Sequence, residues 1–266
     1  MIILSLIVLG VIVGSLINLA ADDLPRRLTP RFPPHCPTCD SPLHPLRRIA
    51  IVGVLTNHIK CLHCESSLKL RSLAVEIVSP FMLLYLYQRF DLTLKFGLLA
   101  ILMECLLVIA VIDLEHRLIL YVTIIPAALI AFIYAMFGAG YDLPKSLIGG
   151  AVGFGAVYVI YFFGWVFGVV TARIRGEELN EVPFGGGDVN LAGVIGLAVG
   201  WSGILLALFI AVMSGGISAA IYLTVSLIRR RYNLFTPIPY GPFLILGAVI
   251  LLLFADEIRS RTGASR

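Results

Sequence analysis

Two aspartates lie where long apolar segments of the chain meet charged loops. Asp113 follows the apolar run 106–112, and Asp188 follows the three glycines at 185–187. Two carboxyl groups held within a few ångströms of each other can share one proton, so one can activate water while the other protonates the carbonyl oxygen or the leaving amine. Such a pair hydrolyses peptides with neither a metal ion nor a covalent intermediate. We therefore take Asp113 and Asp188 as the candidate catalytic residues of an aspartyl protease.

The glycines before Asp188 are the second part of this hypothesis. Gly185 and Gly187 carry no side chain, so a substrate strand can approach the carboxylate of Asp188 closely. The start of a helix is also a favourable place for a negative charge. A single aspartate at a helix end is explained equally well by contact with water, and that alternative stays open for each acid taken alone.

Four cysteines form two Cys-x2-Cys pairs in the segment 22–72, which is too short to build much of a core. The pairs are Cys36 with Cys39 and Cys61 with Cys64. Their spacing is typical of a tetrahedral four-thiolate zinc site. We predict a structural zinc ion, because four thiolates complete the shell and leave no open position for catalysis. Reduced, unliganded thiols or a redox pair are the alternatives. The fifth cysteine, Cys105, lies within an apolar segment and is expected to pack in the interior.

The composition excludes an ordinary soluble domain. Apolar residues make up 59% of the chain, charged residues only 14%, and the mean hydropathy is +0.97. Stretches long enough to cross about 30 Å of hydrocarbon are expected at 1–21, 73–90, 94–113, 118–139, 146–170, 189–206, 208–228 and 239–256. We therefore predict an all-α fold: a polytopic membrane helix bundle of about eight transmembrane helices with a small cytoplasmic zinc-binding loop domain.

Lysine and arginine set the expected orientation. The segment 22–72 holds eight of them, which places it in the cytoplasm. Alternation of the helices then puts Asp113 and Asp188 at cytoplasmic helix ends, at one depth in the membrane, and leaves both chain termini outside. The expected domains are a first transmembrane helix at 1–21, the zinc-binding loop domain at 22–72, a membrane-embedded protease core at 73–256 and a polar tail at 257–266.

Several segments, taken in chain order, resemble the bacterial type IV prepilin leader peptidases, which are membrane aspartyl proteases of the Gly-x-Gly-Asp type. The matching segments are Gly14 to Asn18, Leu24-Pro25, the two cysteine pairs, Ile112 to Ile119, Gly185 to Val189 and Ile238 to Phe243. Any one of them is a weak signal, but their joint order along nearly the whole chain is highly specific.

The resemblance implies removal of a short basic leader from type IV prepilins or type II secretion pseudopilins. Cleavage would occur at the cytoplasmic face of the bacterial inner membrane, immediately before the apolar helix of the substrate. The resemblance also implies N-methylation of the new amino terminus, with S-adenosylmethionine as the methyl donor. The expected partners are these substrates and the lipid bilayer, without nucleic acid; neither the oligomeric state nor the cofactor-binding residues follow from the sequence.

Further acids have open roles. Three glutamates precede the Asp188 loop: Glu177, Glu178 and Glu181. They are candidates for attracting a basic leader, and the alternative is a solvated loop that balances nearby arginines. Glu76 lies a few residues inside the second expected helix and needs a partner there. A structural hydrogen bond and a role near the active site are equal alternatives for it.

Three segments depart from the pattern of the family, and one of them, Arg71 to Glu76, matches the segment before the second helix only in part. Asn190 stands where the family usually has lysine, and Leu120-Tyr121 replace the usual proline and aspartate. These departures bear on substrate fit and on the second activity, so a peptidase without methyltransferase activity is one alternative. Another is a non-enzymatic membrane protein, either a transporter or a zinc-ribbon assembly factor, whose two acids form a proton or cation path. A transport path favours acids near the bilayer midplane, whereas these are expected at one face.

Overall fold

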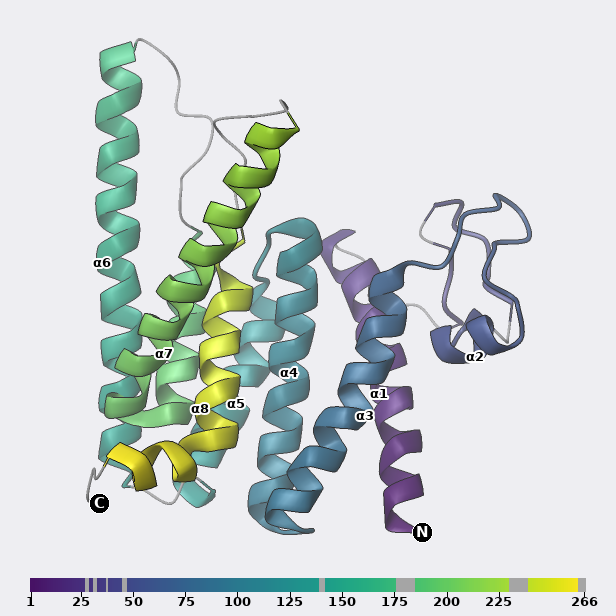
Figure 1. Cartoon of the computed structure of the whole chain (residues 1–266), viewed down its shortest axis with the longest axis horizontal. Helices are drawn as coiled ribbons and strands as arrows, with labels where there is room; N and C mark the ends of the chain where they lie inside the picture. Colours follow the sequence, from purple (N-terminus) through teal and green to yellow (C-terminus); the bar gives the residue numbers. More distant parts are fainter. Residues whose placement is uncertain are drawn as a thin grey trace. The chain divides into compact units, whose positions relative to one another are not determined.

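The computed structural model describes residues 1–26, 29–30, 33–36, 38–44, 47–138, 142–175, 185–229 and 239–262, without the side chains at 171–172, 174–175 and 255–262. Helices account for most of these residues (Figure 1). In chain order they are α1 (Ile2–Asp23), the short 3₁₀ helix η1 (Leu24–Arg26), α2 (Ala50–Leu55), α3 (Leu70–Phe90), α4 (Leu94–His116), α5 (Tyr121–Phe137), α6 (Leu143–Arg175), α7 (Gly186–Ile228) and α8 (Gly241–Thr262). Within these ranges there are isolated β-bridges but no strand. The all-α prediction is confirmed for the described part of the chain.

Five of the described helices are long and apolar enough to cross a membrane: α1, α3, α4, α6 and α7. Two more apolar helices are shorter, namely α5 and the Gly241–Phe254 part of α8. Helix α2 has six residues and belongs to the loop segment. A multi-pass membrane protein is therefore supported, whereas the predicted count of about eight transmembrane helices is not confirmed by length and composition.

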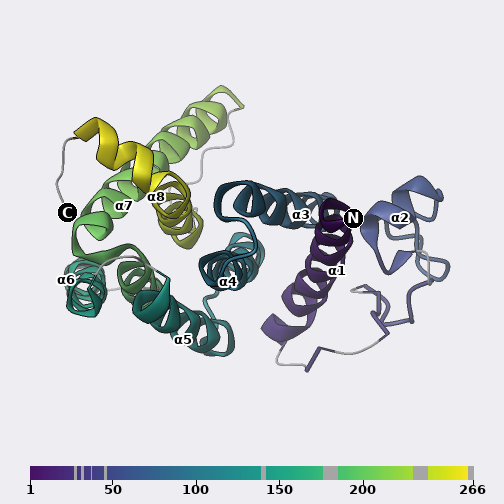
Figure 2. The same cartoon turned by 90° about the horizontal axis from the view of Figure 1, so that it is seen from below.

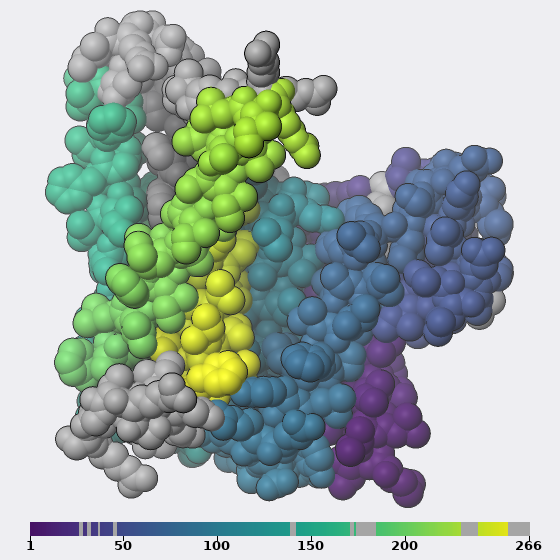
Figure 3. Space-filling model, in the orientation of Figure 1, coloured from purple at the N-terminus to yellow at the C-terminus, as the bar shows by residue number. Residues whose placement is uncertain are grey.

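Large apolar side chains cover the outside of several helices. Phe163 and Phe167 of α6 and Phe209 of α7 are exposed, although water would disfavour them. Figure 3 shows the outer surfaces of α6 and of the later part of α7 uncovered along much of their length. Exposure of this kind is expected for helices whose neighbour is lipid, because hydrocarbon rather than water then surrounds these side chains.

The chain forms two compact units, Met1–Ile112 and Asp113–Arg266. In the first unit, α1 lies beside α3 (Figure 1 and Figure 2). Gly10 packs on the backbone of Pro80, and Gly14 packs on the backbone of Glu76, with no room at either glycine for a Cβ atom. The hydroxyl of Ser79 lies 2.9 Å from the carbonyl oxygen of Gly10 and can donate to it. Small residues and a polar side chain thus hold these two helices together, as is common within membranes.

In the second unit, α6 and α7 pack closely through glycines. Gly196 faces the backbone of Gly149, and Gly153 faces the carbonyl of Ala192; in neither place is there room for a Cβ atom. Backbones that approach this closely gain dispersion contacts over a long interface, which is the main attraction available between helices in lipid.

Helix α7 consists of two arms that join at Gly200. Gly200 has φ 76° and ψ 175°, a non-helical conformation that glycine adopts without steric cost. Along α6, Gly149 lies near Gly196 and Trp201, whereas Gly153 lies near Ala192 and Ile204. The first arm therefore runs antiparallel to α6 and the second arm runs parallel to it, so the chain reverses direction at Gly200.

This reversal corrects the predicted boundary between the sixth and seventh expected helices. That boundary was placed between 206 and 208, by dividing a long apolar stretch into two spans of similar length. The backbone is helical there and leaves the helical region at Gly200 instead. The sequence Gly200-Trp201-Ser202-Gly203 contains the turn signal that marks the true position.

The packing of α6 on α7 predicts unequal effects of two Gly→Ala substitutions. Gly196→Ala should destabilise the protein by about 1–3 kcal/mol, because the new methyl group meets the backbone of Gly149 and the helices must separate. Gly155→Ala is the matched control on α6, since a Cβ atom there meets nothing within 4 Å. Thermal unfolding in detergent, followed by circular dichroism, measures both. Equal stability of the two variants would contradict this description of the interface.

Candidate active site and metal centre

Two turns in the loop segment have the same backbone geometry. Each is closed by two main-chain hydrogen bonds: Cys36 N–H to Ser41 O (2.8 Å) and Asp40 N–H to Cys36 O (2.9 Å) in the first, and Cys61 N–H to Ser66 O (3.0 Å) and Glu65 N–H to Cys61 O (3.1 Å) in the second. Asp40 and Glu65 have φ of 57° and 55°, so both turns use a left-handed residue at the equivalent position. Each turn is also flanked by an isolated β-bridge. The two Cys-x2-Cys motifs thus form a pair of equivalent knuckles.

The two knuckles bring four sulfur atoms together. All four Sγ atoms lie within 4.8 Å of one another. The Sγ atoms of Cys36 and Cys64 are 3.7 Å apart, and those of Cys39 and Cys61 are 3.8 Å apart. In a tetrahedral site with Zn–S bonds of about 2.3 Å, neighbouring sulfurs are separated by about 3.8 Å, whereas a disulfide requires about 2.05 Å. The cysteines are free, and their arrangement fits a closed four-thiolate metal site.

Local hydrogen bonds favour the thiolate form that a metal requires. The backbone amides of His63 and Cys64 donate to the sulfur of Cys61 and lower its pKa to about 5. Burial opposes ionisation of Cys36, but hydrogen bonds from the Ser66 hydroxyl and neighbouring amides lower its pKa to about 7. At neutral pH a thiol with a pKa of about 5 is largely deprotonated and one with a pKa of about 7 is about half deprotonated, and the deprotonated state is the one that binds zinc.

The loop segment is attached to the membrane helices of the first unit by buried polar contacts. Glu76, on α3, is 1% exposed, and its two carboxylate oxygens accept the amide hydrogens of Ala50 and Ile51 at 2.8 and 2.9 Å. It therefore caps the amino terminus of α2, where backbone N–H groups lack helical partners. Of the two roles considered for Glu76, the structural hydrogen bond is the one observed.

Asp113 lies in the last turn of α4 and is 4% exposed. The amide of Arg117 donates to its carbonyl oxygen at 2.8 Å, and Arg117 takes a left-handed φ of 54° as the chain leaves the helix. Gly241, the first residue of α8, faces the carboxyl group: a Cβ atom there would lie 2.5 Å from Asp113 Oδ2. The absence of a side chain at Gly241 is what leaves space for this carboxyl group.

Asp188 lies in the first turn of α7 and is 9% exposed. Gly185 is the N-cap residue, and its carbonyl accepts the amide hydrogen of Asp188 at 3.1 Å. The three glycines before Asp188 are not equivalent. A Cβ atom would meet open space at Gly186 but would lie 2.6 Å from the Cβ of Ile119 at Gly187. Gly187 is therefore required by close packing rather than by backbone flexibility.

The two aspartates approach each other within the second unit. Ile119, which follows α4, packs against both Gly187 and Gly241, so it brings the start of α7 and the start of α8 to the end of α4. The charge of Asp113 acts directly on Asp188. Among the described residues, Asp113 Oδ2 and Asp188 Oδ1 are both buried and have no hydrogen-bond partner. The pair therefore has one uncommitted oxygen on each side, as two groups that bind and activate a water molecule require.

Tyr240 lies beside this pair. Its pKa is raised by burial and further by the negative charge of Asp188. A cavity of about 240 Å³ adjoins it and is lined mainly by apolar and small residues, among them Gly215, Gly216 and Phe243. Tyr240 thus lines an apolar space in the same unit as the two acids, although neither acid lines it.

The structure describes some of the other candidate residues and leaves three glutamates outside its described ranges. Glu177, Glu178 and Glu181 lie outside the described residues. Asn190 donates from its side chain to the carbonyl of Gly186 at 3.3 Å, so it closes the first turn of α7. Ile119 and Tyr240 belong to the matching segments, but the sequence did not indicate their contacts at the site.

Two protein-family models match this chain. Residues 100–220 match the type IV leader peptidase family, and residues 8–90 match the N-terminal domain of bacterial A24 peptidases. The chain belongs to the type IV leader peptidase family. Both aspartates lie within the first match, and all four cysteines lie within the second.

Relatives in this family are similar over almost the full chain. A protein of Stutzerimonas stutzeri is 28% identical, covering 96% of this chain and 92% of the relative. A protein of Bacillus subtilis is 27% identical, covering 96% and 95%, and one of Pseudomonas aeruginosa is 26% identical, covering 96% and 91%. Each is named a prepilin leader peptidase/N-methyltransferase. No solved structure gives a significant match.

The sulfur cluster predicts stoichiometric zinc that depends on the knuckle cysteines. Purified wild-type protein should contain about one zinc ion per chain, and Cys61→Ser should reduce this to a small fraction because a closed site loses one of four ligands. Cys105→Ser is the matched control, since Cys105 lies in α4 outside the cluster. Elemental analysis after dialysis measures the zinc content. Full zinc in Cys61→Ser, or none in the wild type, would contradict the assignment.

Proposed function

We propose that this protein is an intramembrane aspartyl endopeptidase that removes the basic leader of type IV prepilins or type II secretion pseudopilins. The observation that carries the proposal is the pair of buried aspartates, each with an unpartnered oxygen, in a member of the leader peptidase family. The names of the full-length relatives support leader cleavage followed by N-methylation of the new amino terminus. The apolar cavity beside Tyr240 is suitable for residues at the start of the apolar helix of the substrate.

The proposed reaction uses the two carboxyl groups in opposite roles. The ionised member of the pair removes a proton from a water molecule held between Asp113 and Asp188, and the protonated member hydrogen-bonds the carbonyl oxygen of the scissile peptide. The water oxygen bonds to the carbonyl carbon as the carbonyl oxygen takes the proton of the protonated acid. Collapse of this tetrahedral intermediate breaks the C–N bond, the proton taken from water passes to the leaving amine, and the hydroxyl proton returns to the pair. Low exposure of both acids strengthens these interactions, because water does not compete for the same oxygens. The two acids act as a coupled pair, so neither role belongs to one residue alone.

A cytoplasmic active site follows from the charge of the loop segment. The segment 22–72 is rich in lysine and arginine, and we propose that it faces the cytoplasm. Asp113 is near the end of α4, and Asp188 is near the start of α7. If α5, α8 and both arms of α7 also cross the bilayer, eight crossings result and both acids lie at the cytoplasmic face. The membrane would then be the bacterial inner membrane.

Leader recognition and methyl transfer are further parts of the proposal. Glu177, Glu178 and Glu181 precede the Asp188 loop and stay candidates for attracting the basic leader. For methyl transfer, S-adenosylmethionine supplies a methyl group on a sulfonium ion: the amine lone pair forms the N–C bond, sulfur keeps the electrons of the broken C–S bond, and the amine proton passes to solvent.

Asparagine substitutions test the catalytic pair. Asp113→Asn and Asp188→Asn should each reduce cleavage by about 1,000-fold or more, because either change removes one half of the proton-sharing pair. The substrate is a prepilin-like peptide with a basic leader that ends in glycine before an apolar helix. Asp142→Asn is the matched control, since the Asp142 side chain is 77% exposed and pairs with Lys145. Wild-type cleavage rates in either active-site variant would exclude the mechanism.

The glycines before Asp188 provide a test that changes no ionisable group. Gly187→Ala should lower the cleavage rate by about 100-fold, because its methyl group displaces Ile119 and with it the alignment of the two acids. Gly186→Ala should leave the rate within about threefold of wild type, since a Cβ atom there meets nothing within 4 Å. The same prepilin-like peptide measures both variants. A larger loss for Gly186→Ala than for Gly187→Ala would show that flexibility, not packing, explains the motif.

A further inference from the structure

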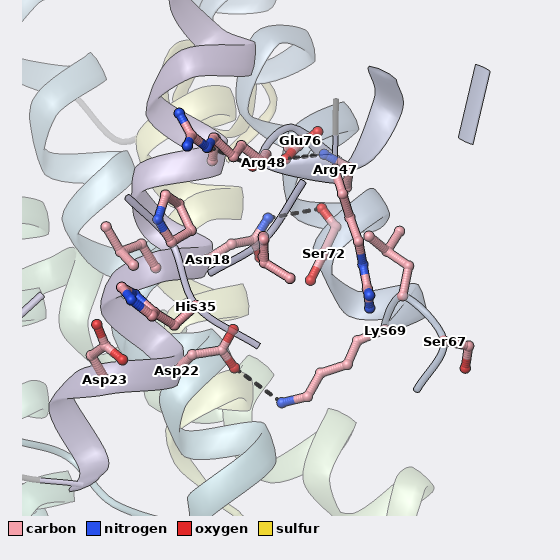
Figure 4. Close-up of a pocket in the computed structure, with 16 residues that line it drawn as sticks. Asn18, Asp22, Asp23, His35, Arg47, Arg48, Ser67, Lys69, Ser72 and Glu76 are labelled. Atoms are coloured by element: carbon pink, nitrogen blue, oxygen red, sulfur yellow. Dashed lines mark hydrogen bonds and ion pairs between the residues drawn. The ribbon is translucent and has the colours of Figure 1, made fainter. Parts of the chain in front are cut away.

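A small polar cavity lies in the first unit, between the end of α1, the loop segment and the start of α3 (Figure 4). Its volume is about 70 Å³. The polar side chains around it include Asn18 and Asp22 from α1, His35 and Arg47 from the loop, and Glu76 from α3. The residues that line this cavity belong to the first unit, whereas the pair of aspartates belongs to the second.

Arg47 is the charged side chain whose hydrogen bonds are least complete. It is 5% exposed, and its Nη2 donates to the carbonyl of Ser66 at 3.0 Å. Its Nε and Nη1 atoms are buried and have no hydrogen-bond partner among the described residues. Leaving donors of a buried cation unpaired is costly. A guanidinium group with unpaired donors is suited to bind a carboxylate through a charge-assisted hydrogen bond.

Acceptors on the other side of the cavity are also without partners. The amide nitrogen of Asn18 donates to the carbonyl of Ser72 at 2.9 Å, but Asn18 Oδ1 is buried and has no partner within the described part of the chain. The same holds for Nδ1 of His35. Figure 4 shows Asn18 and Arg47 on the walls of the same space. The cavity thus offers free donors on one wall and a free acceptor on the other.

Three carboxylates line the cavity, those of Asp22, Asp23 and Glu76, and each has an interaction partner. Asp22 pairs with Lys69 at 3.1 Å and with Arg71 at 3.0 Å. Glu76 accepts the two amide hydrogens at the start of α2. Neither acid is paired with Arg47, and among the described residues the two donors of Arg47, the oxygen of Asn18 and Nδ1 of His35 remain without hydrogen-bond partners. A ligand that satisfies them carries a carboxylate and an ammonium group together.

The size of the cavity limits which part of a ligand it holds. Sites that enclose a whole drug-sized ligand have volumes of about 300–1,000 Å³. A cavity of about 70 Å³ holds the few atoms of an α-amino-acid head group but not a nucleoside. The remainder of a larger ligand must extend out of the opening.

We propose that this cavity binds the amino-acid end of S-adenosylmethionine, with its carboxylate on Arg47 and its ammonium group on Asn18. The inference rests on the proposed N-methylation, for which a donor must bind to the protein. The methionine part of the donor is a zwitterion, which matches the free groups of both walls. Its sulfonium and adenosine then lie outside the cavity, where a substrate amine can approach the methyl group. Arg47 and Asn18 bind and orient the donor and take no part in proton transfer.

Direct binding of two ligands tests this site without measuring activity. The full-length, zinc-loaded protein in lipid nanodiscs is titrated with S-adenosylmethionine and with its decarboxylated analogue, which lacks only the carboxylate. Wild type should bind S-adenosylmethionine about 10-fold or more tightly than the analogue, because a charge-assisted pair is lost. Arg47→Met should bind the two ligands with similar affinity. Arg89→Met, an exposed position in the last turn of α3, should keep the wild-type preference.

A leader-cleavage assay distinguishes a failure of this site assignment from a failure of the proposed peptidase function. Arg47→Met should cleave the prepilin-like peptide at the wild-type rate, since the cavity lies in the other unit from the aspartates. If wild type binds both ligands equally, or if a folded Arg47→Met keeps the preference, the site assignment is wrong while the methylation proposal stands. If wild type cleaves peptide but binds no S-adenosylmethionine, both the second activity and this site are excluded. Zinc content reports whether Arg47→Met folds; if it does not, the comparison of the two ligands on wild type decides.

Discussion

The second unit depends on backbones that approach one another too closely for a Cβ atom to fit between them. Gly196 meets the backbone of Gly149 between α7 and α6, and Gly187 meets Ile119 at the start of α7. Lipid gives apolar helices no hydrophobic reason to associate, so shape and close contact must hold them together. The same constraint positions the acids, because Gly241 leaves space for the carboxyl group of Asp113 and Gly187 admits Ile119. The helix packing and the placement of the two acids therefore both require glycine at positions where a Cβ atom has no room.

The loop segment of the first unit is stabilised differently from the membrane helices. It has too few apolar residues for a core of its own, and the structure replaces a core with four clustered sulfurs and with buried polar contacts to α1 and α3. Glu76 is the central example. This carboxylate lies within a membrane-spanning helix, and it accepts hydrogen bonds from the first two backbone amides of the neighbouring short helix α2. Arg47 belongs to the same layer of polar contacts but is only partly satisfied. Both carboxylate oxygens of Glu76 have hydrogen-bond partners, so its contact is structural. Two donors of Arg47 have none among the described residues, which makes Arg47 a candidate for ligand binding.

Local signals in the sequence predicted the helices well but not their contacts. Helix α3 begins at Leu70 and ends at Phe90, close to the expected 73–90, because apolar length and charged flanks are local properties. The spacing of the cysteines predicted their cluster for the same reason. The reversal at Gly200 was missed because hydropathy alone does not register backbone conformation, although a glycine-rich turn signal was present. The contacts of Ile119 with Gly187 and Gly241 join segments far apart in the chain, and the unequal roles of the three glycines follow from that tertiary arrangement.

The reversal at Gly200 also affects how this part of the chain enters a membrane. No Asp, Glu, Lys, Arg or His occurs between Asp188 and Arg229, so the turn at the far end of the two arms carries no charge. Translocation of a charged group across hydrocarbon is the expensive part of membrane insertion. The two arms of α7 are therefore suited to enter together as one hairpin, with Asp188 and the arginine at 229 staying on the side from which they started. In the proposed topology, a helix-forming segment of 43 residues is in this way delivered to the bilayer at low cost, with the acid of its first turn at the membrane face.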